Sequence, residues 1–252
     1  MDVTLLWIIG AGLVAGALSM LLAGLLAFTV LSAWIPRLVS YAAGVLLAVA
    51  FLDVLPEAFE KSSDAGAIGA VTLAGVLGFF LLEKAALWRH QHEHGDTRLH
   101  EHIGGRTGMM ILVGDGFHNF VDGVAIAAAF LTDVKLGVAT ALAMVAHEIP
   151  QELGDFMVLL NSGYARSKAL LFNLLSSLAS VVGGIIGYLL LEDAQTAIPY
   201  ILAVAAASFI YIAVADLIPH MHRSTDARST AWQIALIATG VATIVVTDVL
   251  LH

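Results

Sequence analysis

Runs of about 20 mostly apolar residues recur along the chain with short polar breaks between them, and they constrain its fold more than any other feature. Coiled as α-helix, such a run crosses a bilayer core of roughly 30 Å. Eight runs are present, at residues 4–30, 38–58, 66–88, 107–131, 135–160, 168–191, 197–220 and 231–251. The sequence therefore predicts an all-α integral membrane protein, with residues 1–252 forming a single transmembrane domain in contact with the lipid bilayer.

The composition agrees with this class and limits the chemistry. Hydrophobic residues make up 60% of the chain and charged residues only 12%, against roughly 25% charged in a soluble domain. No nucleic-acid partner is expected. The chain has no cysteine, so a metal site has to use oxygen and imidazole nitrogen.

The basic residues are shared unequally between the loops. The loops after spans one, three, five and seven hold nine of the eleven lysines and arginines, and the remaining loops hold only Lys61 and Lys135. Because basic loops stay cytoplasmic, both termini are expected on the extracellular or periplasmic side. The acidic outer loops either concentrate cations near a pathway or are simply solvated.

Span four has polar residues at its apolar centre: Asp115, His118, Asn119 and Asp122. A bare charge at the bilayer midplane costs at least about 2.5–3.5 kcal/mol, so something must compensate it. The spacing of three and four residues puts Asp115, His118 and Asp122 on one helix face, with Asn119 at its flank.

Span five places a second polar group at the same depth: His147, Glu148, Gln151, Glu152 and Asp155. Pro150 is expected to kink this helix and to free the carbonyl of Ala146. Neither helix interior contains a lysine or arginine. Buried carboxylates without basic partners must be protonated or bind a cation. A divalent cation is the simpler explanation, and hydrogen bonding between the helices is the alternative.

The pattern Asp-x-x-Pro occurs twice, near the ends of spans two and seven. Span two is expected to end outside and span seven inside, so the two copies lie at opposite mouths. Inverted repeats of this kind are typical of secondary transporters. We expect Asp53 and Glu57 to receive a metal ion from outside, and Asp216 and His220 to receive it on the way in.

Three motifs, HNFVDG at 118–123, HEIPQELGD at 147–155 and FLDVLPEA at 51–58, resemble those of the ZIP family of zinc and iron transporters, especially its histidine-rich branch. The resemblance extends to span number, outward termini and loop placement. It implies a bundle with an inverted 3+2+3 repeat and elevator-like metal uptake toward the cytoplasm. It also implies a binuclear centre between spans four and five, with zinc as cargo and iron, manganese or cadmium as alternatives.

Transferred position by position, the resemblance implies metal ligands at His118, Asn119, Asp122, His147, Glu148, Gln151 and, in span six, Asn173. Two positions depart from the branch: Gln151 replaces its usual histidine, and Asp53 stands where histidine is frequent. A neutral amide oxygen should weaken binding of a borderline metal and leaves a shift toward iron or manganese open. Metal selectivity therefore does not follow from the resemblance.

The predicted loop at residues 89–106 lies between spans three and four and is cytoplasmic by the loop count. It carries five histidines: His90, His92, His94, His100 and His102. One interpretation is a solvated linker, and the other is weak metal capture or sensing, since neutral imidazole is a common ligand. In either case the loop should be flexible and dispensable for the central site.

Two other functional classes compete with transport. His147-Glu148 opens like the His-Glu-x-x-His motif of zinc proteases, but Gln151 occupies the position of the second histidine. An intramembrane metal-dependent hydrolase is therefore disfavoured, and a metal-sensing membrane protein is the third class. We expect a transporter and no enzymatic activity. The compact chain with short loops favours a bacterial inner membrane, and a homodimer is left open.

Overall fold

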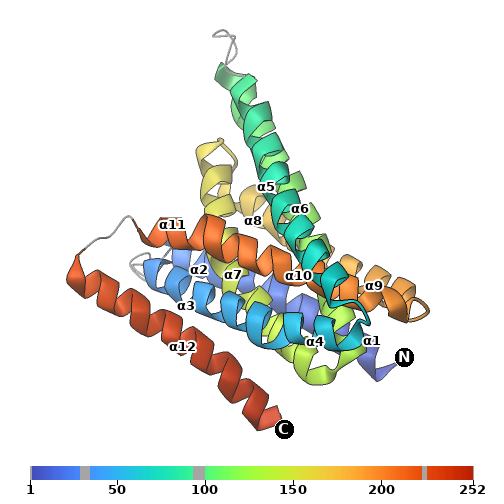
Figure 1. Ribbon diagram of the computed structural model, residues 1–252. Helices are drawn as coiled ribbons and strands as arrows, with labels where there is room; N and C mark the ends of the chain where they lie inside the picture. Colours follow the sequence, from blue (N-terminus) through green and yellow to red (C-terminus); the bar gives the residue numbers. More distant parts are fainter. Residues whose placement is uncertain (1, 29–34, 93–99, 223–225, 252) are drawn as a thin grey trace.

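The computed structural model describes residues 2–28, 35–92, 100–222 and 226–251, and almost all of these residues are helical (Figure 1). The elements are α1 (Val3–Leu13), η1 (Val14–Leu18), α2 (Ser19–Phe28), α3 (Ile35–Ala48), η3 (Val49–Val54), α4 (Leu55–Lys61), α5 (Ala65–His92), α6 (His100–Thr132), α7 (Val134–Asn161), α8 (Arg166–Ser177), α9 (Ala179–Leu191), η5 (Gln195–Ala197), α10 (Ile198–Tyr211), η6 (Ile212–Leu217), α11 (Ile218–Met221) and α12 (Ala227–Leu251). No strand occurs in these ranges.

Six helical stretches within the described ranges are long and apolar enough to cross a membrane: Val3–Leu22, Pro36–Lys61, Ala65–Leu82, Arg166–Leu191, Gln195–Ala215 and Ala227–Leu250. Predicted spans four and five correspond to α6 and α7, which have 33 and 28 residues. Both helices are long enough to cross a membrane. The polar residues at their centres make them less apolar than the six stretches named above. The six apolar stretches fit a helical membrane protein, and α6 and α7 carry polar residues at their centres.

The two polar helices pack against each other inside the bundle. α6 also makes extensive contact with the shorter helix α9, while α7 contacts α2 and α3. α12 lies outside, against α3, and α5 packs mainly on α10 (Figure 1). Any group carried at the centres of α6 and α7 is therefore enclosed by the surrounding helices.

Glycines fix how closely α6 approaches α9. A Cβ atom at Gly123 would collide with the Ser180 carbonyl, and one at Gly183 would collide with the Phe120 carbonyl. Small residues at helix contacts let backbones approach closely, which stabilises helix pairs in a membrane through van der Waals packing. The close contact at Gly123 and Gly183, called the glycine seam below, holds the polar face of α6 in position.

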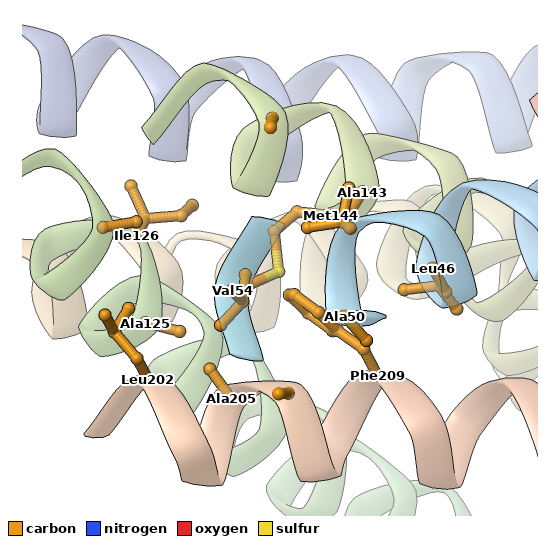
Figure 2. Close-up of a cluster of buried hydrophobic side chains, with 14 of the residues drawn as sticks. Leu46, Ala50, Val54, Ala125, Ile126, Ala143, Met144, Leu202, Ala205 and Phe209 are labelled. Carbon is orange, nitrogen blue, oxygen red and sulfur yellow. The ribbon is translucent and has the colours of Figure 1, made fainter. Parts of the chain in front are cut away.

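Apolar side chains form a core between helices of the bundle (Figure 2). Its members come from α3, η3, α6, α7 and α10 and are at most 3% exposed: Leu46, Ala50, Val54, Ala125, Ile126, Ala143, Met144, Leu202, Ala205 and Phe209. The ring of Phe209 lies 6.3 Å, centroid to centroid, from that of His147. The core therefore shields one side of the polar site from water.

The two Asp-x-x-Pro motifs share the same backbone irregularity. In each, a six-residue π-helix begins four residues before the aspartate and ends two residues before the proline: η3 precedes Pro56, and η6 precedes Pro219. Proline cannot donate to the carbonyl four residues earlier and its ring clashes with it, and π-bulges accommodate such faults in a helix. The repeated pattern thus extends from sequence to backbone geometry.

α7 runs as α-helix on both sides of Pro150, and the kink expected there stays a prediction. Two predicted boundaries differ from the structure. Span six is two helices, α8 and α9, joined at Leu178. α5 ends at His92 and α6 begins at His100, so helix extends into the predicted 89–106 loop from both sides. The histidine repeats here gave no apolar periodicity from which this extension could be predicted.

Candidate metal centre

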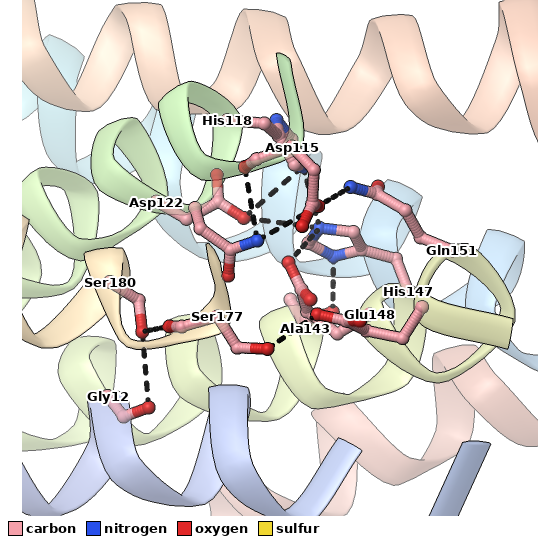
Figure 3. A network of polar contacts seen from close by, with 12 residues as sticks. Gly12, Asp115, His118, Asp122, Ala143, His147, Glu148, Gln151, Ser177 and Ser180 are labelled. Atoms are coloured by element: carbon pink, nitrogen blue, oxygen red, sulfur yellow. Dashed lines mark hydrogen bonds and ion pairs between the residues drawn. The ribbon is translucent and has the colours of Figure 1, made fainter. Parts of the chain in front are cut away.

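Four side chains from α6 and α7 converge on one point (Figure 3). His118 and Asp122 come from α6, and His147 and Glu148 come from α7; one ligand atom of each lies within 4.8 Å of the others. Asp122 Oδ2 is 3.2 Å from His147 Nε2 and 3.5 Å from His118 Nε2, and the two Nε2 atoms are 3.3 Å apart. The structure brings together these four of the residues predicted from sequence.

The orientation of His147 makes the cluster suitable for a cation. Its Nδ1 lies 2.9 Å from the Ala143 carbonyl oxygen, which can only accept, so Nδ1 is the donor and, in the neutral ring, Nε2 presents a lone pair. That lone pair faces Asp122 Oδ2, which is also an acceptor. His118 Nε2 can donate at most one proton, either to His147 Nε2 or to Asp122 Oδ2. The other atom then has no donor from the cluster.

Buried oxygen atoms at this point lack hydrogen-bond donors. Within the described part of the chain, Asp122 Oδ2 and both carboxylate oxygens of Glu148 are buried without a hydrogen bond. Asp122 is 3% exposed and Glu148 1%. Apart from Lys135 in the second residue of α7, no lysine or arginine occurs between Arg106 and Arg166. Unpaired buried carboxylates are costly, and a bound cation removes that cost.

A second group lies beside the four ligands. Asp115 Oδ1 accepts hydrogen bonds from Asn119 Nδ2 at 3.0 Å and from Gln151 Nε2 at 3.1 Å. Asn119 Nδ2 also lies 3.2 Å from the Asp115 carbonyl oxygen. Asp115 and Asn119 are buried. The structure therefore links these three predicted residues mainly to one another.

A third group connects α7 to α8. Glu152 Oε1 accepts a 2.7 Å hydrogen bond from Ser177 Oγ, and Asn173 Nδ2 donates to the Glu152 carbonyl oxygen at 3.0 Å. Glu152 Oε2 and Asn173 Oδ1 are buried without a hydrogen bond among the residues described. Asn173 thus lies against α7, whereas Asp155, further along α7, is partly exposed.

Sequence reasoning missed Ser177, which holds Glu152 in place. Ser177 ends α8, and Ser180 Oγ lies 2.8 Å from its carbonyl oxygen and 3.2 Å from that of Gly12, so its single proton has two acceptors within reach. Serines that hydrogen-bond backbone carbonyls around an interruption in a helix are a signal that the sequence contains, in SSLAS at 176–180.

An acidic cavity of about 380 Å³ opens at the ends of α4, α7 and α12. It contains the predicted pathway residues Asp53 and Glu57. Its further charged lining residues were not assigned a role from sequence: Glu60, Asp133, Lys135 and Asp248. They come from three separate segments, and only the fold brings them together. Glu57 also pairs with Lys61 at 3.4 Å, an exposed contact of small energetic weight.

The remaining predicted residues have side chains outside those described. Asp216 lies in η6 and His220 in α11, and only their backbones are described. The same holds for four loop histidines: His90, His92, His100 and His102. His94 lies within residues 93–99, which are outside the described ranges altogether.

Comparison with known proteins identifies the family. Residues 88–248 match the family model of the ZIP zinc transporter. The chain is 38% identical to human zinc transporter ZIP10 over 141 residues, which is 53% of this chain and 17% of that protein. It is 42% identical over 118 residues to the Bos taurus metal cation symporter ZIP14, covering 47% of this chain and 24% of the relative.

A third relative extends the similarity to most of the chain. The Pongo abelii zinc transporter ZIP13 is 30% identical over 230 residues, which is 84% of this chain and 67% of that protein. By contrast, the chain spans less than a quarter of the ZIP10 and ZIP14 relatives. Because the family model covers well over half of the residues, the chain belongs to the ZIP zinc transporter family.

Proposed function

We propose that this chain is a transporter, not an enzyme, and that it moves a divalent metal cation, zinc first, across the membrane into the cytoplasm. The observation that carries the proposal is the cluster of partly exposed His118 with buried Asp122, His147 and Glu148, in which carboxylate oxygens lack hydrogen bonds. Neither helix interior supplies a lysine or arginine to these carboxylates, and the four side chains face one another inside a helical bundle. The relatives named above are called zinc transporters or a metal cation symporter.

The dimensions of the cluster support zinc as cargo. Zinc binds imidazole nitrogen at about 2.0–2.1 Å, so two nitrogen ligands at a tetrahedral angle stand about 3.3–3.4 Å apart. The separations among His118 Nε2, His147 Nε2 and Asp122 Oδ2 are 3.3, 3.2 and 3.5 Å. These three atoms are thus spaced as three corners of a tetrahedral site, and Glu148 Oε1, 3.8 Å from His147 Nε2, is the fourth. Iron, manganese and cadmium are the other candidate cargoes, because the nitrogen and oxygen donors suit them too.

We further propose that a second ion binds next to the first. Glu148 offers two unpaired oxygens, so one can serve each ion. Glu152 lies one turn further along α7, and its Oε2 and the Oδ1 of Asn173 in α8 are also without a hydrogen bond among the described residues. A site of oxygen atoms alone would bind more weakly than the imidazole cluster and would suit release. The two ions together would form a binuclear centre.

The route that we propose begins at the acidic cavity. Asp53 and Glu57 line it with Glu60, Asp133 and Asp248, and clustered negative charge raises the local concentration of cations. Asp53 belongs to η3, whose residues Ala50 and Val54 border the central core. From the central cluster the ion would pass Glu152 and leave past Asp216 and His220, at the second copy of the Asp-x-x-Pro motif.

The proposed topology has eight spans, including α6 and α7, with both termini outside. Tyr188 Oη donates to Asp2 Oδ2 at 2.8 Å, which joins the start of α1 to the end of α9. The acidic cavity joins the ends of α4 and α12 to the start of α7. These contacts support one shared outer end, and the matching registers of η3 and η6 support the inverted repeat. The plasma membrane, in a bacterium the inner membrane, is the proposed location.

Flux into proteoliposomes tests the proposal. Wild-type protein should give saturable Zn²⁺ uptake, and Glu148→Gln should lower it by more than about tenfold, since even indirect changes around a metal cost 10–100-fold in affinity. Asp226→Asn is the matched control, because Asp226 lies just before α12, away from the cluster, and its hydrogen bonds to described residues are with Ser229 and Thr230 in its own turn. Its flux should equal that of the wild type.

Two outcomes would favour the competing classes. Tight zinc binding without flux would support a metal sensor, and zinc-dependent hydrolysis without flux would support the intramembrane hydrolase. Equal loss of flux in Glu148→Gln and Asp226→Asn would show that the effect does not come from the central cluster.

A further inference from the structure

The Asp115 carboxylate connects two amide side chains on the two helices that carry the metal cluster. Its Oδ1 accepts from Asn119 Nδ2, on its own helix, and from Gln151 Nε2, on α7. Figure 3 shows the amide group of Gln151 turned toward Asp115. Asp115 is 5% exposed and Asn119 1%, so water competes little for these hydrogen bonds.

This arrangement determines which atom each amide offers to a cation. An ionised carboxylate only accepts hydrogen bonds, so it selects the NH₂ end of an amide and repels the oxygen end. Only the oxygen end can bind a metal ion. With both nitrogens held by Asp115, the Asn119 and Gln151 oxygens point away from it, and the nitrogens are excluded from the metal.

The amides flank the metal cluster along both helices. Asn119 lies between His118 and Asp122 in α6, and Gln151 lies three residues after Glu148, on the next turn of α7. An amide oxygen that faces the cluster would add a neutral ligand to the two nitrogens and two carboxylates. Zinc is satisfied by four ligands, whereas Mn²⁺ prefers six and favours oxygen.

We propose that Asp115 is a positioning residue that sets the metal selectivity of the cluster by holding the Asn119 and Gln151 amides with their oxygens available to the cation. The inference rests on the proposed function, because it concerns the same site. When Asp115 is removed, the amides can rotate and present nitrogen, and an ion that needs more than four ligands is disfavoured more than zinc. Loss of Asp115 should therefore change the ratio of the Mn²⁺ affinity to the Zn²⁺ affinity, in addition to any effect on the stability of the fold.

The test compares Mn²⁺ and Zn²⁺ affinities of the purified protein by calorimetric titration. Asp115→Ala should lower the Mn²⁺:Zn²⁺ affinity ratio by about tenfold, the low end of the effect of residues that orient metal ligands. Asp115→Asn keeps an acceptor oxygen and should preserve most of the ratio. Ser40→Ala, which removes a partly buried hydrogen bond to the Pro36 carbonyl in α3, should leave the ratio unchanged.

A double-mutant cycle separates positioning from general damage. If Asp115 acts through Gln151, Asp115→Ala should change the ratio less in a Gln151→Ala background than in the wild type. An equal fall in both affinities, or an equal change in both backgrounds, would overturn the inference while leaving the proposed function standing. A wild type that binds neither metal and shows no flux would overturn the proposed function as well.

Discussion

Nδ1 of His147 lies 2.9 Å from the carbonyl oxygen of Ala143, one turn earlier in α7. This hydrogen bond fixes the ring so that Nε2, the nitrogen with the free electron pair, faces Asp122 and His118. The helix therefore presents the imidazole ready for a metal ion, and a proton is the natural competitor for the same position.

Acidification should accordingly weaken metal binding. Imidazole and carboxylate ligands must be deprotonated to bind, so binding releases protons and affinity falls as the pH is lowered. Calorimetric titration with Zn²⁺ in two buffers of different ionisation enthalpy measures the number of protons released. An affinity that is constant from pH 7.5 to about 5.5 would contradict the assignment of His118 and His147 as ligands.

The glycine seam between α6 and α9 should tolerate no side chain. Gly183→Val should destabilise the protein by about 1–3 kcal/mol or prevent folding, because overpacking forces the backbones apart and the added Cβ meets the Phe120 carbonyl. Gly69→Val in α5 is the matched control, since a Cβ there meets nothing within 4 Å. The melting temperature in detergent distinguishes them, and equal shifts would argue against close packing at the seam.

Asp248 should assist capture at the acidic cavity without taking part in the central cluster. Asp248→Asn should raise the zinc concentration needed for half-maximal flux by a few-fold, with little change in the maximal rate, because it removes one charge from the mouth. The effect should shrink at high salt. A lower maximal rate with unchanged half-saturation would place Asp248 elsewhere in the mechanism.

The tether between α1 and α9 gives a prediction with a defined pH window. The hydrogen bond from Tyr188 lowers the pKa of Asp2 below its usual value. A lowered carboxyl pKa in the folded state means that the tether stabilises the protein at neutral pH and is lost as the pH falls through that value. Tyr188→Phe should raise the pKa of Asp2, measured by NMR titration, and an unchanged value would show that the contact is not formed in solution.

Much of the central site follows from the sequence because helical spacing is regular. Polar residues three and four apart in two long apolar segments have to face the same way, so the approach of His118 and Asp122 to His147 and Glu148 could be expected. The partners of Asp115 and Glu152 could not be, because they depend on which side-chain atoms meet across helices. The charged lining of the cavity could not be predicted from the sequence either, since Asp133 and Asp248 are 115 residues apart.

The interruptions of the helices could also be predicted from the sequence only in part. A proline inside a helix predicts a local disturbance, and π-helices do precede Pro56 and Pro219. α7, however, continues through Pro150, and the sixth span is interrupted at Leu178, where there is no proline. In a packed bundle, neighbouring helices and serine hydroxyls decide where the backbone can be interrupted.

Zinc K-edge X-ray absorption on protein that transports zinc tests the central claim most directly. With zinc bound, the spectrum should show two imidazole ligands together with oxygen ligands at about 2.0–2.2 Å. His118→Gln should remove one imidazole from the spectrum, while Asp226→Asn should leave both. A zinc environment without imidazole in the wild type, or one unchanged by His118→Gln, would contradict the account.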